Sequence, residues 1–147
     1  IISFDKRVPL DLDGSQHRSV YLPILRDRLP DVLDLFDFAE PSLVTGDRQT
    51  TNVPLQALYL MNSSFVMEQA RSLAGLVTEQ ANTPEERLRL AFVRCLGRTP
   101  DETELRLAAD FMATQNGAGD ATKDDVISAL SRYCQSLLAT SEFRNVD

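Results

Sequence analysis

The amino-acid sequence predicts a mainly all-α fold, a bundle of about five or six helices with an irregular N-terminal arm. One short strand pair could accompany the helices. First, residues 55–147 are rich in Ala, Leu, Arg and Glu and place apolar residues at helical spacing. Second, the helix-start signal Thr-Pro-acid-Glu occurs at Thr83 and again at Thr99. Third, residues 1–54 hold five of the seven prolines, which favours irregular backbone there.

The chain length of 147 residues suits one compact domain, with the irregular arm at 1–54 and the helical core at 55–147. The first residue is Ile1 rather than Met, so we expect a fragment of a larger protein. Hydrophobic residues make up 43% and charged residues 25%, which is typical of a globular domain and excludes a disordered tail. The longest apolar stretches are too short and too interrupted for a membrane span.

The arm contains two short predicted elements. A strand is expected at Val20–Leu22, before a proline, and a short helix at Pro30–Phe38. The next helices are predicted at Leu55–Asn62 and Ser64–Gln80, because the residues between them are good helix caps. Their expected core positions are Leu58, Met61, Phe65, Ala70, Leu73 and Val77.

Three further helices follow. A capping box at Thr83–Glu86 opens a helix that is expected to run to about Leu96 and to end at Gly97. Thr99 is expected to start the next helix in the same way, and the short link predicts that the two helices form an antiparallel pair. Thr122 is expected to cap the last helix. The apolar stripe of that helix comprises Val126, Leu130, Tyr133, Cys134, Leu137 and Leu138.

The charge balance bears on possible partners. Twenty-two acidic residues against 15 basic ones give a net charge of −7. Binding of nucleic acid depends on clustered Lys and Arg side chains that neutralise phosphates. An acidic chain without a basic run therefore argues against nucleic acid as a partner.

The two cysteines, Cys95 and Cys134, both lie in apolar helical patterns. The simpler interpretation is two buried free thiols that act as small hydrophobic side chains. The alternative is a disulfide between the two helices, which requires an exported protein and close Cα atoms.

No catalytic constellation is visible in the sequence. His17 is the single histidine, and the HExxH, CxxCH, Walker and GxSxG motifs are all missing. We therefore assign no catalytic residue, no metal ligand and no cofactor site to this chain.

The segment 46–56 is unusually dense in hydrogen-bonding side chains and runs directly into an apolar helix. Its simplest interpretation is an elaborate helix cap, with Gln56 in the first turn. That interpretation gives Arg48 no role. A guanidinium at this position could hold a carboxylate of the preceding segment, a ligand anion or a sugar. The candidate ligand- or partner-binding residues are Asp37, Arg48, Thr50, Thr51, Gln56 and Asn62.

An ordered series of short sequence blocks is similar to one known family. The blocks are RSVYLP (18–23), LDLFDF (33–38), RQTTNVPLQALYLMN (48–62), SSFV (63–66), EQA (68–70), LGRTP (96–100), SEF (141–143) and VD (146–147). Over residues 18–147 this series resembles a PSD-type C-terminal domain of unknown function. That domain occurs in large planctomycete proteins associated with cytochrome c-like modules.

The resemblance implies that this chain is the C-terminal fragment of a much longer, exported or periplasmic parent protein, with haem in a separate upstream module. It implies no reaction, and it assigns no haem ligand to this chain. The sequence departs from the family pattern at Asn52, where Thr or Val is usual, and at 139–141, where an Asn-rich stretch is usual.

Two hypotheses about function follow. The first is an accessory or interaction domain that completes the upstream domain of the same chain, and it predicts an exposed apolar or Arg-rich patch beside residues 48–56. The second is part of an enzyme site for carbohydrate or polyol, completed by the upstream domain. In that site Asp37, Arg48, Thr50 and Gln56 would line a concave pocket.

Overall fold

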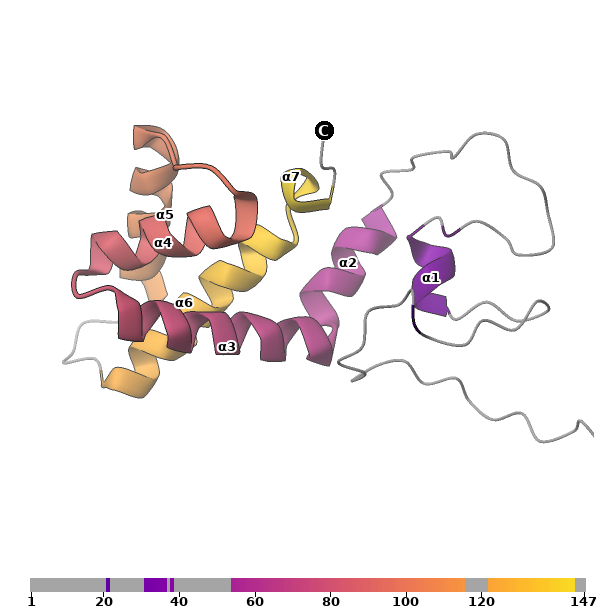
Figure 1. The fold of residues 1–147 in the computed structure, drawn as a ribbon, viewed down its shortest axis with the longest axis horizontal. Helices are drawn as coiled ribbons and strands as arrows, with labels where there is room; N and C mark the ends of the chain where they lie inside the picture. Colours follow the sequence, from indigo (N-terminus) through magenta and orange to yellow (C-terminus); the bar gives the residue numbers. More distant parts are fainter. Residues whose placement is uncertain (1–20, 22–30, 37, 39–53, 116–121, 145–147) are drawn as a thin grey trace, which may run out of the picture. The chain divides into compact units, whose positions relative to one another are not determined.

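The computed structural model describes Tyr21, residues 31–36, Phe38 and residues 54–115 and 122–144. The elements in these residues are helices, and no strand occurs among them, so the predicted all-α fold is confirmed (Figure 1). Val20 and Leu22 of the predicted strand lie outside the described residues. The chain divides into two compact units, residues 1–56 and residues 57–147.

Five helices have nine or more residues, and two short ones accompany them in the described part of the chain. Their bounds are α1 (Asp31–Leu35), α2 (Pro54–Asn62), α3 (Ser64–Gln80), α4 (Pro84–Leu96), α5 (Glu102–Gln115), α6 (Lys123–Leu138) and α7 (Ser141–Arg144). The predicted bounds of α3 are confirmed, α2 begins one residue earlier than predicted, and α7 was not predicted. None of the described helices is long and apolar enough to cross a bilayer.

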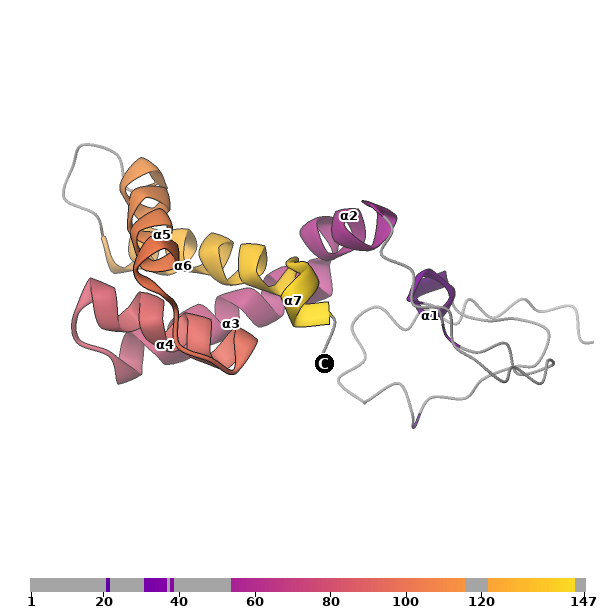
Figure 2. The same cartoon turned by 90° about the horizontal axis from the view of Figure 1, so that it is seen from above.

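The core of the second unit is centred on α3 and α6, which make the largest helix–helix contact and run in opposite directions (Figures 1 and 2). Ala70 and Ala74 of α3 are fully buried, and these small side chains let the two helices approach closely. Leu130 and Cys134 of α6 are fully buried as well. Leu88 and Phe92 of α4 complete this core, as the sequence predicts.

The two ends of α4 form as the sequence predicts. Thr83 Oγ1 accepts a hydrogen bond from the Glu86 backbone N–H at 3.2 Å, and the Glu86 carboxylate accepts one from the Thr83 N–H at 3.1 Å. At the other end, Gly97 takes a left-handed conformation with φ of 73°. Local capping signals therefore fix both ends of this helix.

The start of α5 differs from the prediction, because Asp101 caps the helix rather than Thr99. Asp101 Oδ1 accepts from the Glu104 N–H at 2.7 Å, and Glu104 Oε2 accepts from the Asp101 N–H at 2.8 Å. Asp is as good a cap as Thr, and a Glu stands three residues after it, so the reciprocal cap forms two residues later. The link from Gly97 to Asp101 is correspondingly longer, and α5 crosses α4 steeply instead of lying antiparallel to it (Figures 1 and 2).

The orientation of α2 also differs from the prediction. The expectation that Leu58 and Met61 belong to the core is wrong, since their exposed fractions are 57% and 61%. The opposite side of α2 carries Leu60, which is buried. Gln135 Nε2 of α6 donates a hydrogen bond to the Met61 carbonyl at 2.7 Å and so fixes the C-terminal end of α2 with this side inward.

Candidate functional site

The structure describes two of the six residues that the sequence singles out, Gln56 and Asn62. The other four, Asp37, Arg48, Thr50 and Thr51, lie outside the described residues.

Gln56 makes a long-range contact with the backbone. Its side chain is buried, and its Nε2 donates a hydrogen bond to the Leu35 carbonyl at 2.9 Å. Leu35 is the last residue of α1, where helical carbonyls lack a partner within the helix. Gln56 therefore satisfies the end of α1 from the first turn of α2, and the contact joins two of the sequence blocks that carry the family resemblance.

Asn62 and Ser63 form the turn between α2 and α3. Asn62 is exposed, and its Nδ2 donates to the Leu58 carbonyl at 2.8 Å. Ser63 is buried, and its Oγ accepts from the Val66 N–H at 3.5 Å. Both side chains thus have backbone-capping roles in this turn.

An apolar stripe on α2 is the first surface that a partner could use. Leu55, Leu58 and Met61 recur every three residues along the helix, and each side chain is more than half exposed. We call these three residues the α2 stripe. It begins inside the polar segment 46–56 and extends beyond it along the helix. Exposed apolar side chains that share one line are typical of an interaction surface.

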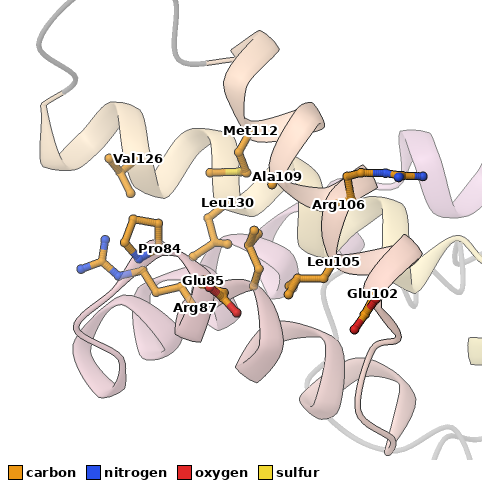
Figure 3. A pocket seen from close by; sticks show the side chains of 11 residues that line it. Pro84, Glu85, Arg87, Glu102, Leu105, Arg106, Ala109, Met112, Val126 and Leu130 are labelled. Carbon is orange, nitrogen blue, oxygen red and sulfur yellow. The ribbon is translucent and has the colours of Figure 1, made fainter.

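A pocket of about 550 Å³ in the second unit is the second candidate (Figure 3). It lies between α4, α5 and α6, where the steep crossing of α5 leaves space beside the first turns of α4. Leu88 and Leu130, both buried, line it together with the half-buried Leu105, Met112 and Val126. The remaining lining residues are Pro84, Glu85, Arg87, Glu102, Arg106 and Ala109. The sequence did not indicate this pocket, because its apolar residues come from three helices and each fits an ordinary core pattern.

Charged side chains lie at the edges of the pocket. Arg87 is half-buried, and its Nε donates to the Ala81 carbonyl at 3.1 Å. Glu85 is paired with Arg89 at 3.0 Å, so its charge is offset. In Figure 3 the guanidinium groups of Arg87 and Arg106 lie at opposite ends of the pocket.

The cysteines are free thiols in the structure, and Cys134 is buried, as the simpler interpretation of the sequence predicts, whereas Cys95 is half-buried. Burial raises the pKa of Cys95 to about 11 and that of Cys134 to about 12. Both side chains therefore stay protonated at neutral pH, and a protonated thiol is a poor nucleophile and a poor metal ligand. Among the described residues, no group of three or more His, Cys, Asp and Glu side chains is placed to hold a metal ion.

Comparison with known proteins identifies a family without an assigned activity. No curated protein and no solved structure matches the chain. The family described as PSD1, protein of unknown function (DUF1553), matches residues 5–112, which is well over half of the chain. The matched range includes α1 to α4, the α2 stripe and most of α5. The chain therefore belongs to the PSD1 family of proteins of unknown function.

Proposed function

We propose that this chain is an accessory domain without catalysis of its own, within a large, exported, cytochrome-associated protein of the planctomycete type. In that protein it binds the upstream domain of the same polypeptide. The observation that carries the proposal is the α2 stripe, because Leu55, Leu58 and Met61 expose an apolar line directly beside the polar segment 46–56.

The stripe has the chemistry of a binding surface. Covering one large apolar side chain contributes about 1.5–3 kcal/mol through removal of its surface from water. A few such side chains commonly supply most of the affinity of an interface. Three of them on one helix are therefore enough for a small, specific contact with another domain.

The helix that carries the stripe is held in place before any partner arrives. Leu60 is buried on the opposite side of α2, and Gln135 donates a hydrogen bond to the Met61 carbonyl. A surface that is already ordered loses little conformational entropy on binding. The stripe is therefore already ordered for binding to a rigid partner such as a folded upstream domain.

The test is binding in trans. The upstream domain of the parent polypeptide and this chain are prepared separately and mixed in a calorimeter. The proposal predicts saturable one-to-one binding with a negative heat-capacity change, which marks burial of apolar surface. Absence of binding would overturn it, and hydrolysis of a polysaccharide by the mixture would favour the enzyme hypothesis.

A further inference from the structure

The pocket between α4, α5 and α6 is a second site, independent of the α2 stripe. Its volume of about 550 Å³ falls within the range of small-molecule sites, which are mostly apolar with a few polar groups at defined places. Leu88, Leu105, Met112, Val126 and Leu130 supply the apolar surface. These dimensions and this lining suit a flexible alkyl chain or a small ring system.

The charged side chains at the edge of the pocket differ in how strongly they would act on a bound ligand. Glu85 is already paired with Arg89. Glu102 and Arg106, on α5, are both exposed, so water and salt screen their charges. Arg87 lies at the opposite end of the pocket from Arg106 (Figure 3), and because it is half-buried its charge is screened less.

Arg87 is also the best-positioned of these side chains for binding. It is half-buried, and the bond from its Nε to the Ala81 carbonyl fixes the orientation of the guanidinium. No hydrogen bond from its Nη atoms occurs among the residues that the structure describes. A guanidinium with its Nε already anchored can still offer two Nη groups to a carboxylate, and charge-assisted bonds of this kind are strong.

We propose that this pocket binds an amphipathic small molecule with an apolar chain and one anionic group, such as a medium-chain fatty acid. The chain lies against Leu88 and Leu130, and the anion binds the Nη atoms of Arg87.

The experiment compares three ligands that share one alkyl chain. Decanoate and decyltrimethylammonium, each below its micelle concentration, and decan-1-ol, below its solubility limit, are titrated into the full chain. Binding is followed by NMR shifts of the backbone amides. Decanoate should bind saturably and about tenfold more tightly than decyltrimethylammonium. The affected amides should lie in α4, α5 and α6. Equal affinity for the carboxylate and the cation, or no saturable binding, would overturn the proposal.

Two pairs of variants localise the site. Ala109→Trp places a large side chain in the pocket and should abolish binding of all three ligands. Leu107→Trp is the control, since Leu107 lies on the same helix, is exposed and does not line the pocket. Arg87→Gln should remove the preference for decanoate over decyltrimethylammonium, and Arg87→Lys should retain most of it. If Ala109→Trp still binds decanoate as the unchanged protein does, the ligand lies elsewhere and the assignment is wrong.

Discussion

Arg98 and Glu142 are joined by two hydrogen bonds although 44 residues separate them in the sequence. Arg98 Nε donates to Glu142 Oε1 at 2.6 Å, and Arg98 Nη2 donates to Glu142 Oε2 at 2.9 Å. The same guanidinium bonds both carboxylate oxygens of Glu104, at 2.9 and 2.7 Å, and lies 4.9 Å from the centre of the Phe92 ring. Arg98 thereby connects the turn after α4, the first turn of α5 and the short α7.

This connection predicts how α7 is stabilised. With four residues, α7 is too short to persist alone, because helix nucleation is unfavourable. Glu142→Gln should therefore increase amide hydrogen exchange in α7 at least several-fold, while α3 exchanges as before. The control is Glu85→Gln, which removes an exposed pair within one helix and should leave α7 unchanged. Unchanged exchange in α7 of Glu142→Gln would show that Arg98 does not hold this helix.

The same cluster predicts an acid-dependent loss of stability. Hydrogen bonds from Arg98, and then from the Asp101 backbone, lower the pKa of Glu104 from 4.5 to about 2. Arg98 also lowers the pKa of Glu142. A carboxyl group whose pKa is lower in the folded state stabilises the fold above the unfolded pKa, and this contribution is lost as pH falls through the folded pKa.

The measurement is urea unfolding of the unchanged protein and of Glu104→Gln between pH 6 and pH 2. The unchanged protein should be the more stable at pH 6, and the difference in free energy of unfolding should shrink between pH 4.5 and 2. A difference that stays constant down to pH 2 would contradict the assigned cause of the pKa shift.

Two glycines should respond to alanine in opposite directions. Gly97 has φ of 73°, a conformation that disfavours alanine, so Gly97→Ala should lower the free energy of unfolding by about 1 kcal/mol. Gly75 lies inside α3, and an added Cβ would meet nothing within 4 Å, so Gly75→Ala should raise it by about 1 kcal/mol. Thermal unfolding of the two variants checks both signs, and a shared sign would contradict the helix ends described above.

The thiols should be unreactive in the folded protein. Because burial raises the pKa of Cys95 and Cys134, a disulfide reagent at neutral pH should react slowly with both until guanidinium chloride unfolds the chain. As pH is raised, the half-buried Cys95 should react before the buried Cys134. Fast modification of Cys134 in the folded state would mean that α6 opens readily near that residue.

Helix bounds could be predicted from the sequence because their causes are local. The caps at Thr83 and Thr122 and the stop at Gly97 each depend on residues within a few positions. The cap of α5 was predicted two residues too early, because Thr99 and Asp101 are both acceptable caps and only their surroundings decide between them.

The sequence could not predict which side of α2 is buried, because apolar residues occur on two sides of that helix. Leu55, Leu58 and Met61 form the more apolar stripe, yet the side with Gln56 and Leu60 is the buried one. Burial of Gln56 requires an acceptor for its amide, and that acceptor is the Leu35 carbonyl, 21 residues away. The sequence pattern alone contains no sign of such a distant partner, and the same holds for the pocket built from three helices.

The most direct test of the accessory-domain proposal is the affinity of a variant with a charged α2 stripe for the upstream domain. Leu58 and Met61 are exposed, so the double variant Leu58→Glu, Met61→Glu should fold with nearly unchanged stability. Leu107→Glu, on α5, is the matched control. The proposal predicts that the double variant binds the upstream domain at least about tenfold more weakly while the control binds normally. Equal affinity of the double variant and the unchanged protein would contradict it.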